Sequence, residues 1–292
     1  MKILVSGSSG FIGFHLIKEL LNAGHEVVGF DNHNDYYSPD LKLKRLTLLS
    51  SKKFTFYELD LNNILVSDQD FDLAINLAAQ AGVRVPAEKD YLYETTNIEG
   101  FNSFCSFCTK RNIKKIIYAS SSSVYSDINE GKYDEVNTPL QPKSNYGKSK
   151  LANELHASEL AKLNDLSMVG LRFFSVYGPF GRPDMAYYAF AQAIKNKHTV
   201  ILNNEGNMYR DMTYIDDIIQ GVLGAINYAA NPKNIYKNEI FNLGNDAPIK
   251  TKYMLNTIEK YLGKKAIIQQ CKTNNENLKT HANITKAKNF ID

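Results

Sequence analysis

Short apolar runs alternate with longer segments of mixed polarity from the start of the chain to Phe173. Several of these runs are apolar on both faces, which is typical of parallel strands that are covered by helices on both sides. The alternation therefore predicts an α/β fold built on a doubly wound parallel sheet of the Rossmann type. We expect strands at Lys2–Ser6, Glu26–Phe30, Phe54–Glu58, Asp72–Leu77, Lys114–Ala119 and Ser167–Phe173, and helices at Phe11–Asn22, Glu94–Arg111 and Asn145–Lys162.

This rhythm changes after Tyr177, where a Gly-Pro pair interrupts the pattern. The remainder of the chain mixes helices and strands less regularly and becomes rich in lysine and asparagine toward its end. We expect helices at Ala186–Lys197, Asp217–Ala229 and Lys250–Leu262, and strands at Thr199–Leu202 and Glu239–Leu243. The sequence thus predicts a Rossmann domain at residues 1–177 and a smaller mixed α/β C-terminal substrate domain at residues 178–292.

Composition and charge exclude some classes of function. The net charge is +3 and both signs are interspersed, so we expect no nucleic-acid partner, which would call for a clustered basic face. No apolar run approaches the roughly 20 residues that span a bilayer, and we expect no signal peptide. We therefore expect a cytoplasmic protein with no membrane partner, and we expect no metal site.

The three cysteines raise the question of redox chemistry. Cys105 and Cys108 are spaced like a redox pair, but both fall inside the helix expected at Glu94–Arg111, among phenylalanines. This setting favours packed thiols on a buried helix face. Together with Cys271 they make a small, odd number, which is typical of reduced thiols in the cytoplasm.

A glycine-rich turn follows the first expected strand and opens the first expected helix, with the sequence GSSGFIG at residues 7–13. Gly7 would permit the tight turn, Gly10 would let a pyrophosphate approach the helix N-terminus, and Gly13 would let the helix pack closely on the sheet. A purely structural glycine turn is the alternative, but the flanking strand and helix favour dinucleotide binding. Asp31 directly follows the second expected strand, where a carboxylate accepts hydrogen bonds from ribose hydroxyls and repels a 2′-phosphate. NAD is therefore favoured over NADP.

Tyr146 and Lys150 lie four residues apart at the start of an expected helix and so share one helix face. Tyrosine is a poor base near neutral pH, but a nearby ammonium group and the positive nicotinamide of NAD⁺ would lower the pKa of Tyr146. A surface pair on an amphipathic helix is the alternative interpretation. The position of the pair after a strand that ends in the serine run at residues 120–123 favours catalysis, because open α/β sheets bind ligands at the carboxyl ends of their strands.

Taken together, these elements resemble the extended short-chain dehydrogenases/reductases, and within them the nucleotide-sugar 4-epimerases. The resemblance is greatest to UDP-glucuronate 4-epimerases and extends from residue 2 to about residue 262. The matching stretches are GSSGFIGFHL, DNHNDYY, NLAAQAGVR, YASSSSVY, SNYGKSK, LRFFSVYGPFGRPDM, YRDMTYIDDI and FNLGN. The resemblance implies an NAD-dependent isomerase that converts UDP-glucuronate to UDP-galacturonate through a transient 4-keto sugar and enzyme-bound NADH, with polysaccharide biosynthesis as the natural use of the product.

The resemblance also implies roles for individual residues. Tyr146 would take the proton of the sugar 4-hydroxyl, Lys150 would tune it and hold the nicotinamide ribose, and Ser121 would complete the proton network. Further NAD contacts would come from Phe11, Ile12, Asn32, Asp60, Leu61, Leu77, Ala78, Ala79 and Asn97. Candidates for binding the anionic groups of the substrate are Arg84, Arg182 and Arg210, because guanidinium pairs bidentately with carboxylate or phosphate.

Ser122 and Ser123 separate related chemistries. The 4,6-dehydratases of this fold have Asp and Glu at these positions, as the acid and base for loss of water. Serine cannot serve as that pair, but it can hydrogen-bond a carboxylate. We therefore expect Ser122, Ser123 and Ser175 to hold the substrate carboxylate away from the geometry that favours loss of CO₂ from a 4-keto uronic acid.

The pattern leaves two alternatives open. One is a 4-epimerase of another, neutral or N-acetylated, UDP-hexose, and the other is a non-catalytic dinucleotide-binding protein. The chain also departs from the pattern, with Ser126 in place of a glycine and with KTNNEN at residues 272–277 in place of a PGD-containing loop, so we expect a C-terminal domain that is shortened at its end. A homodimer is expected, formed by the helices at Glu94–Arg111 and Asn145–Lys162.

Overall fold

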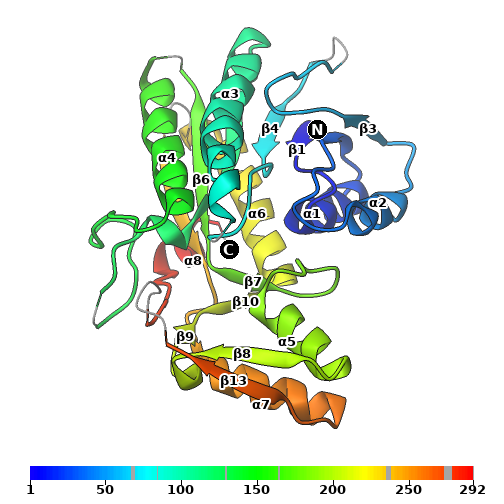
Figure 1. Ribbon diagram of the computed structural model, residues 1–292. Coiled ribbons are helices and arrows are strands. Elements are labelled where there is room, and N and C mark those ends of the chain that lie inside the picture. Colours follow the sequence, from blue (N-terminus) through cyan, green and yellow to red (C-terminus); the bar gives the residue numbers. More distant parts are fainter. Residues whose placement is uncertain are drawn as a thin grey trace.

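The computed structural model describes residues 1–66, 70–83, 85–128, 130–163, 165–234, 238–272 and 278–291. Within these residues the centre of the protein is a seven-stranded sheet in the order β11-β6-β5-β4-β1-β2-β3, with every neighbouring pair parallel (Figure 1). This confirms the doubly wound sheet. Its strands are β1 (Lys2–Ser6), β2 (Glu26–Asp31), β3 (Phe54–Glu58), β4 (Leu73–Asn76), β5 (Lys115–Ser121), β6 (Ser167–Phe173) and β11 (Asn238–Leu243).

Helices cover both faces of the sheet (Figure 1). On one face α1 (Phe11–Asn22) and α6 (Ile215–Ala230) share a core with apolar residues of the strands. On the other face α3 (Gly100–Lys110) and α4 (Asn145–Leu163) pack on the alternate side chains of the same strands. A short helix α2 (Pro39–Thr47), which the sequence did not predict, follows β2. The strand order reverses between β1 and β4, so the carboxyl ends of these two strands form the edge where this fold binds ligands.

Two elements that the sequence assigned to the smaller domain belong to the central layers. Strand β11 pairs in parallel with β6, from Asn238 opposite Met168 to Leu243 opposite Phe173. All seven residues of β6 are buried, so its outer edge needs a partner strand. The continuous apolar face of α6 likewise packs on the sheet beside α1. A boundary at residue 177 therefore does not separate the central sheet from the rest of the chain.

The smaller part lies beyond the carboxyl ends of the strands, at the bottom of Figure 1. Its core joins α5 (Ala186–Lys195), β8 (Thr199–Asn203) and α7 (Thr251–Leu262), and β13 (Ile267–Cys271) pairs with β8. Short pairs link it to the sheet: β7 (Ser175–Tyr177) with β10 (Met212–Tyr214), and β9 (Tyr209–Arg210) with β12 (Ile249–Lys250). The remaining helices are η1 (Ala87–Lys89), η3 (Ser122–Val124), η4 (Asn204–Gly206), η5 (Pro232–Asn234) and α8 (Thr285–Phe290).

The helix expected at Glu94–Arg111 consists of two parts. It begins as a π-helical segment, η2 (Tyr93–Glu99), and continues as α3. The thiols of Cys105 and Cys108 are buried on the inner face of α3, and burial raises the pKa of Cys105 to about 12, so the packed-thiol interpretation holds. In the part of the chain that the structure describes, no helix is long and apolar enough to cross a membrane.

Candidate active site

A cavity of about 1420 Å³ lies between the carboxyl ends of the central strands and the smaller part. Its wall combines the glycine-rich turn, the loop after β2, the ends of β4, β5 and β6, and strands β7 to β10. Sites for a single small ligand usually occupy about 300–1000 Å³. The larger volume suits a dinucleotide together with a second ligand.

Neighbouring backbone atoms leave no room for a side chain at two positions of the glycine-rich turn. Gly7 has a φ of 70°, and a Cβ on it would lie 2.6 Å from the Ala78 nitrogen. A Cβ on Gly13 would lie 2.1 Å from the Gly7 carbonyl oxygen, so α1 approaches the turn more closely than any larger residue permits. No side chain caps α1 at Gly10, and Gly10, Phe11 and Ile12 line the cavity. The uncapped N–H groups at this helix N-terminus therefore suit the pyrophosphate of a dinucleotide.

Acidic and amide groups follow the end of β2. Asp31 lines the cavity, and its Oδ1 accepts a hydrogen bond from the His33 amide at 2.9 Å. Lys42 approaches the same Asp31 oxygen at 3.8 Å. Asn32 Nδ2 donates to Asp60 Oδ2 at 2.8 Å, which joins the loops after β2 and β3. Of the other expected cofactor contacts, the structure places Leu61, Leu77, Ala78 and Ala79 on the cavity wall.

Asn97 is the exception among the expected cofactor contacts. It is buried in η2, and the cavity wall does not include it. Its Oδ1 accepts from the Gln80 amide at 2.7 Å, and its Nδ2 donates to Ser149 Oγ at 3.0 Å. Asn97 thus connects the loop after β4 to helix α4 without lining the cavity.

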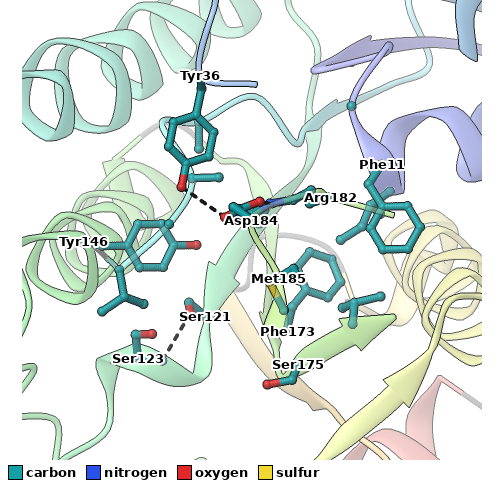
Figure 2. A pocket seen from close by; sticks show the side chains of 18 of the residues that line it. Phe11, Tyr36, Ser121, Ser123, Tyr146, Phe173, Ser175, Arg182, Asp184 and Met185 are labelled. Atoms are coloured by element: carbon teal, nitrogen blue, oxygen red, sulfur yellow. Dashed lines mark hydrogen bonds and ion pairs between the residues drawn. The ribbon is translucent and has the colours of Figure 1, made fainter. Parts of the chain in front are cut away.

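Tyr146 and Lys150 occupy the first turns of α4 and face the cavity beside the end of β5. Figure 2 shows Tyr146 and Ser121 beside the same space, and a hydrogen bond with Ser121 lowers the pKa of Tyr146. Lys150 Nζ donates to the Ala119 carbonyl at 2.9 Å and lies 5.9 Å from the centre of the Tyr146 ring. Burial lowers the pKa of Lys150 to about 8. The structure therefore brings together the three residues that the sequence singled out for catalysis.

Burial and two neighbouring groups act on the pKa of Tyr146. Burial raises the pKa of Tyr146, and the opposing influences within the protein are the charge of Arg182 and the Ser121 hydrogen bond. Charge from bound ligands is therefore needed to lower the pKa of Tyr146 further.

The serine run leaves β5 at the cavity. The Ser123 amide donates to Ser121 Oγ at 3.1 Å, which caps the single turn η3. Ser122, Ser123 and Ser175 all line the cavity, and Figure 2 shows Ser121, Ser123 and Ser175 around one space below Tyr146. Ser120 differs from the others, because its hydroxyl donates to the buried Glu154 carboxylate at 2.5 Å.

Arg182 reaches the same space from the loop after β7. It forms an ion pair with Asp184, with 3.0 Å between Arg182 Nε and Asp184 Oδ1. The Tyr36 hydroxyl, from the loop after β2, donates to Asp184 Oδ2 at 3.0 Å (Figure 2). Tyr36 and Asp184 were not predicted as site residues, although they lie in the matching stretches DNHNDYY and GRPDM.

The other two candidate arginines lie elsewhere. Arg210 on β9 lines the cavity from the smaller part, where its Nη1 donates to the Tyr209 carbonyl at 2.9 Å. Arg84 lies outside the described residues. Among the described residues, no group of three or more His, Cys, Asp or Glu side chains is arranged to hold a metal ion.

A buried polar network, which was not predicted from the sequence, connects helix α4 to the central sheet. Glu154, one turn after Lys150 on α4, forms a two-point ion pair with Arg172 on β6, at 2.8 and 2.7 Å. Arg172 also donates to the Tyr125 hydroxyl at 2.8 Å, and Tyr125 donates to Asn242 on β11 at 2.7 Å. The network joins the catalytic helix to two neighbouring strands and to the end of the serine segment.

Comparisons with known proteins agree with this geometry. The pattern of the NAD dependent epimerase/dehydratase family matches residues 3–244. UDP-glucuronate 4-epimerase 1 of Arabidopsis thaliana is 37% identical over 99% of this chain and 72% of its own length. Protein CapI of Staphylococcus aureus is 39% identical over 91% of this chain and 85% of its own. The crystal structure of UDP-glucuronic acid 4-epimerase from Bacillus cereus, in complex with UDP-glucuronic acid and NAD, superposes with a TM-score of 0.91 at 33% identity, covering 100% of this chain and 93% of that one.

Proposed function

The chain belongs to the NAD dependent epimerase/dehydratase family, and from this premise we propose that it is an NAD-dependent UDP-sugar 4-epimerase that interconverts UDP-glucuronate and UDP-galacturonate. One observation carries the proposal. The proton-transfer group formed by Tyr146, Ser121 and Lys150 shares one cavity with a dinucleotide turn and with three serine hydroxyls that suit a carboxylate. Galacturonate for surface polysaccharide would be the natural use of the product.

The cofactor is held by residues whose geometry fits it. The N-terminus of α1 at Gly10 would receive the pyrophosphate, and Asp31, which also lines the cavity, would accept hydrogen bonds from the adenine-ribose hydroxyls. Lys42 is the cation beside Asp31, but it does not reverse the preference for NAD over NADP, which carries the 2′-phosphate. Its ammonium group lies 3.8 Å from Asp31 and also donates to Asn34 Oδ1 at 2.8 Å. NAD supplies the reversible two-electron oxidation of the sugar C4, and it is restored in each cycle.

Proton transfer belongs to Tyr146. Its phenolic oxygen accepts the proton of the sugar 4-hydroxyl and returns it after the 4-keto sugar has turned over in the cavity. Ser121, hydrogen-bonded to Tyr146, orients the phenol toward C4. Lys150, fixed on the Ala119 carbonyl, holds the nicotinamide ribose. General acid–base groups placed in this way contribute about 10²–10⁴-fold to the rate.

The uronate carboxylate is the group that the serines recognise. Carbon C5, which carries the carboxylate, neighbours the reacting C4, so a carboxylate near Tyr146 meets Ser122, Ser123 and Ser175. Hydroxyl donors hold the carboxylate without the charge repulsion that acidic side chains would cause. Arg182 adds positive charge on the Tyr146 side of the same space. Arg210, farther away on the smaller part, and Arg84 are assigned to the diphosphate.

Nuclear magnetic resonance of the anomeric protons tests the function. The purified protein is incubated with UDP-glucuronate and catalytic NAD, with UDP-glucose as the matched neutral substrate. We expect UDP-galacturonate signals at a constant final ratio and no release of CO₂. If only UDP-glucose is epimerised, the carboxylate assignment is wrong; if neither sugar changes, the protein is a dinucleotide-binding protein without this activity.

Ser122→Ala and Ser175→Ala test how the carboxylate is held. We expect lower turnover and a rise in the decarboxylated UDP-pentose product, because the carboxylate then rotates toward the geometry that favours CO₂ loss. Ser126→Ala, outside the cavity wall, is the matched control. Unchanged turnover and unchanged product purity in both variants would remove the serines from this role.

The protein is proposed to act as a cytoplasmic homodimer. The inner faces of α3 and α4 pack against the sheet, whereas Leu155 and Leu163 on α4 are 65% and 73% exposed. A second copy of α3 and α4 would cover these side chains in a four-helix arrangement. Light scattering after size exclusion tests this state, and Leu155→Glu is expected to shift a dimer toward monomer. Free Cys105 and Cys108 are compatible with the cytoplasm.

A further inference from the structure

Arg45 on α2 is the largest charged side chain that is completely buried, at 0% exposure. Within the described residues, all of its recorded hydrogen bonds end on uncharged oxygens. Nη1 donates to the Ser9 carbonyl at 3.0 Å and to the Tyr37 hydroxyl at 2.6 Å, and Nε and Nη2 donate to the Phe180 carbonyl at 3.1 and 2.7 Å. A buried cation without a carboxylate partner is costly, so its retention indicates a role beyond packing.

The first loop that Arg45 contacts is the dinucleotide turn. Ser9 lies between Gly7 and Gly10, and its carbonyl accepts a hydrogen bond from Arg45. The positive charge of Arg45 is thus held on the backbone of the turn that leads into α1, whose N-terminus is the proposed pyrophosphate site. In a buried site of low effective dielectric, such a charge strengthens the attraction for an anion.

The second loop, residues 178–184, carries Arg182. Phe180 in this loop has a φ of 56°, which is an uncommon conformation for a large side chain. Its carbonyl receives two hydrogen bonds from Arg45, and its ring packs edge-on against Phe14 of α1 at 5.3 Å. The Pro179 carbonyl lies 2.9 Å from His15 Nε2. Arg45 and α1 together therefore fix the backbone two residues before Arg182.

The third loop, residues 32–38, supplies Tyr37 to Arg45 and Tyr36 to Asp184. Asp184 is in turn the ion-pair partner of Arg182. Arg45 therefore lies at the junction of the loop that holds the pyrophosphate, the loop after Asp31 and the loop that presents Arg182 to Tyr146.

We propose that Arg45 is a positioning residue that couples the dinucleotide site to the uronate site, so that binding of NAD improves binding of the sugar carboxylate and the reverse. This inference rests on the proposed function. The planar guanidinium has five N–H donors in one fork and can hold the Ser9 and Phe180 carbonyls together, whereas a lysine ammonium cannot reproduce that fork. Coupling between two ligands is reciprocal, so either ligand can report it.

Binding measurements by calorimetry separate the charge of Arg45 from its geometry. The variants are Arg45→Met, Arg45→Lys and Tyr37→Phe, and Lys44→Met is the matched control because Lys44 is an exposed cation on the same helix. For each variant we measure the affinity for NAD alone, and the affinities for UDP-glucuronate and UDP-glucose with and without NAD. Thermal melting verifies that each variant is folded.

In the wild-type protein we expect NAD to strengthen UDP-glucuronate binding about tenfold, with a smaller effect on UDP-glucose, which lacks the carboxylate. Arg45→Met should lose this enhancement and bind NAD about tenfold more weakly. Arg45→Lys should recover most of the NAD affinity, because it restores the charge, but not the enhancement. Tyr37→Phe should reduce the enhancement partly, and Lys44→Met should change nothing.

Two results would overturn the proposal. One is an Arg45→Met variant that is folded and retains the NAD enhancement. The other is an equal loss of affinity for UDP-glucuronate and UDP-glucose, which a general disturbance of the loop would produce. Failure of the proposed function can be distinguished from failure of this proposal, because it appears as absent turnover in the wild-type protein. The NAD affinities of Arg45→Met and Arg45→Lys then still test the effect of the Arg45 charge on the dinucleotide turn.

Discussion

Replacement of Arg172 by methionine tests the buried ion pair beneath the active site. Arg172 and Glu154 contact each other at two points, at 2.8 and 2.7 Å. Their side chains are only 3% and 6% exposed, so water screens the pair little. At 2.7 Å and an effective dielectric constant of about 20, the Coulomb attraction is roughly 6 kcal/mol, and it offsets the desolvation of the two charges.

Arg172→Met leaves the Glu154 carboxylate buried, with the Ser120 hydroxyl as its remaining partner in the described part of the chain. Loss of one member of a buried pair costs about 3–5 kcal/mol, a large share of the total stability of about 5–15 kcal/mol that is usual for a folded protein. With a urea dependence of about 3 kcal/mol per molar, the unfolding midpoint should fall by roughly 1–2 M. The chain has no tryptophan, so far-ultraviolet circular dichroism is the suitable probe.

The double variant Glu154→Met/Arg172→Met is the matched control. It removes both charges and fills the space with apolar side chains, so it should recover to within about 1 kcal/mol of the wild-type protein. If Arg172→Met lowers the midpoint by less than about 0.3 M, or if the double variant is as unstable as the sum of the single variants, the pair does not stabilise the site in this way.

Three other changes test the proton chemistry, the thiols and the turn. Burial lowers the pKa of Lys150 to about 8, so its cation is lost as pH rises through that value and kcat should fall there. Lys150→Arg should be about 10²-fold slower, and its kcat should fall only at higher pH. If the pH at which kcat falls does not move, another group causes the fall. Burial raises the pKa of Cys105 to about 12, so Ellman's reagent should titrate one thiol of three, the exposed Cys271, until denaturant is added; two fast thiols would contradict the packing. Gly13→Ala would place a Cβ 2.1 Å from the Gly7 carbonyl oxygen. The affinity for NAD, measured by calorimetry, should therefore fall about 5- to 150-fold. An unchanged affinity would mean that the turn adapts freely.

The sequence predicted the buried strands well because their apolar runs are local. The expected bounds of β1, β3 and β6 agree with the structure at every residue, and so do those of α1. The dinucleotide turn and the pair Tyr146 and Lys150 were recognisable for the same reason, since each is a short pattern with a helix or strand beside it. For these elements the information lies within about one element, although the short helix α2 was missed.

The remainder depends on contacts between distant segments, which no local pattern records. The apolar residues of β11 indicate a strand, but not that the chain returns to pair with β6. Glu154 and Arg172 each look like an ordinary charge on a helix or strand, and only the fold makes them a pair. The same holds for Arg45, whose exposed neighbours on α2 gave no reason to expect a completely buried cation.

The balance of charge around Tyr146 supports the proposal that serines hold the uronate carboxylate. Burial raises the pKa of Tyr146, and the protein opposes this through Arg182 and the Ser121 hydrogen bond. A positive nicotinamide would lower that pKa further, whereas a carboxylate in contact with the phenol would raise it again. Ser122 and its neighbours can take the carboxylate without adding negative charge of their own, and Arg182 offsets the charge that the substrate brings. In the proposed function, the site would therefore bind a uronate beside Tyr146 and still let the Tyr146 phenolate accept a proton near neutral pH.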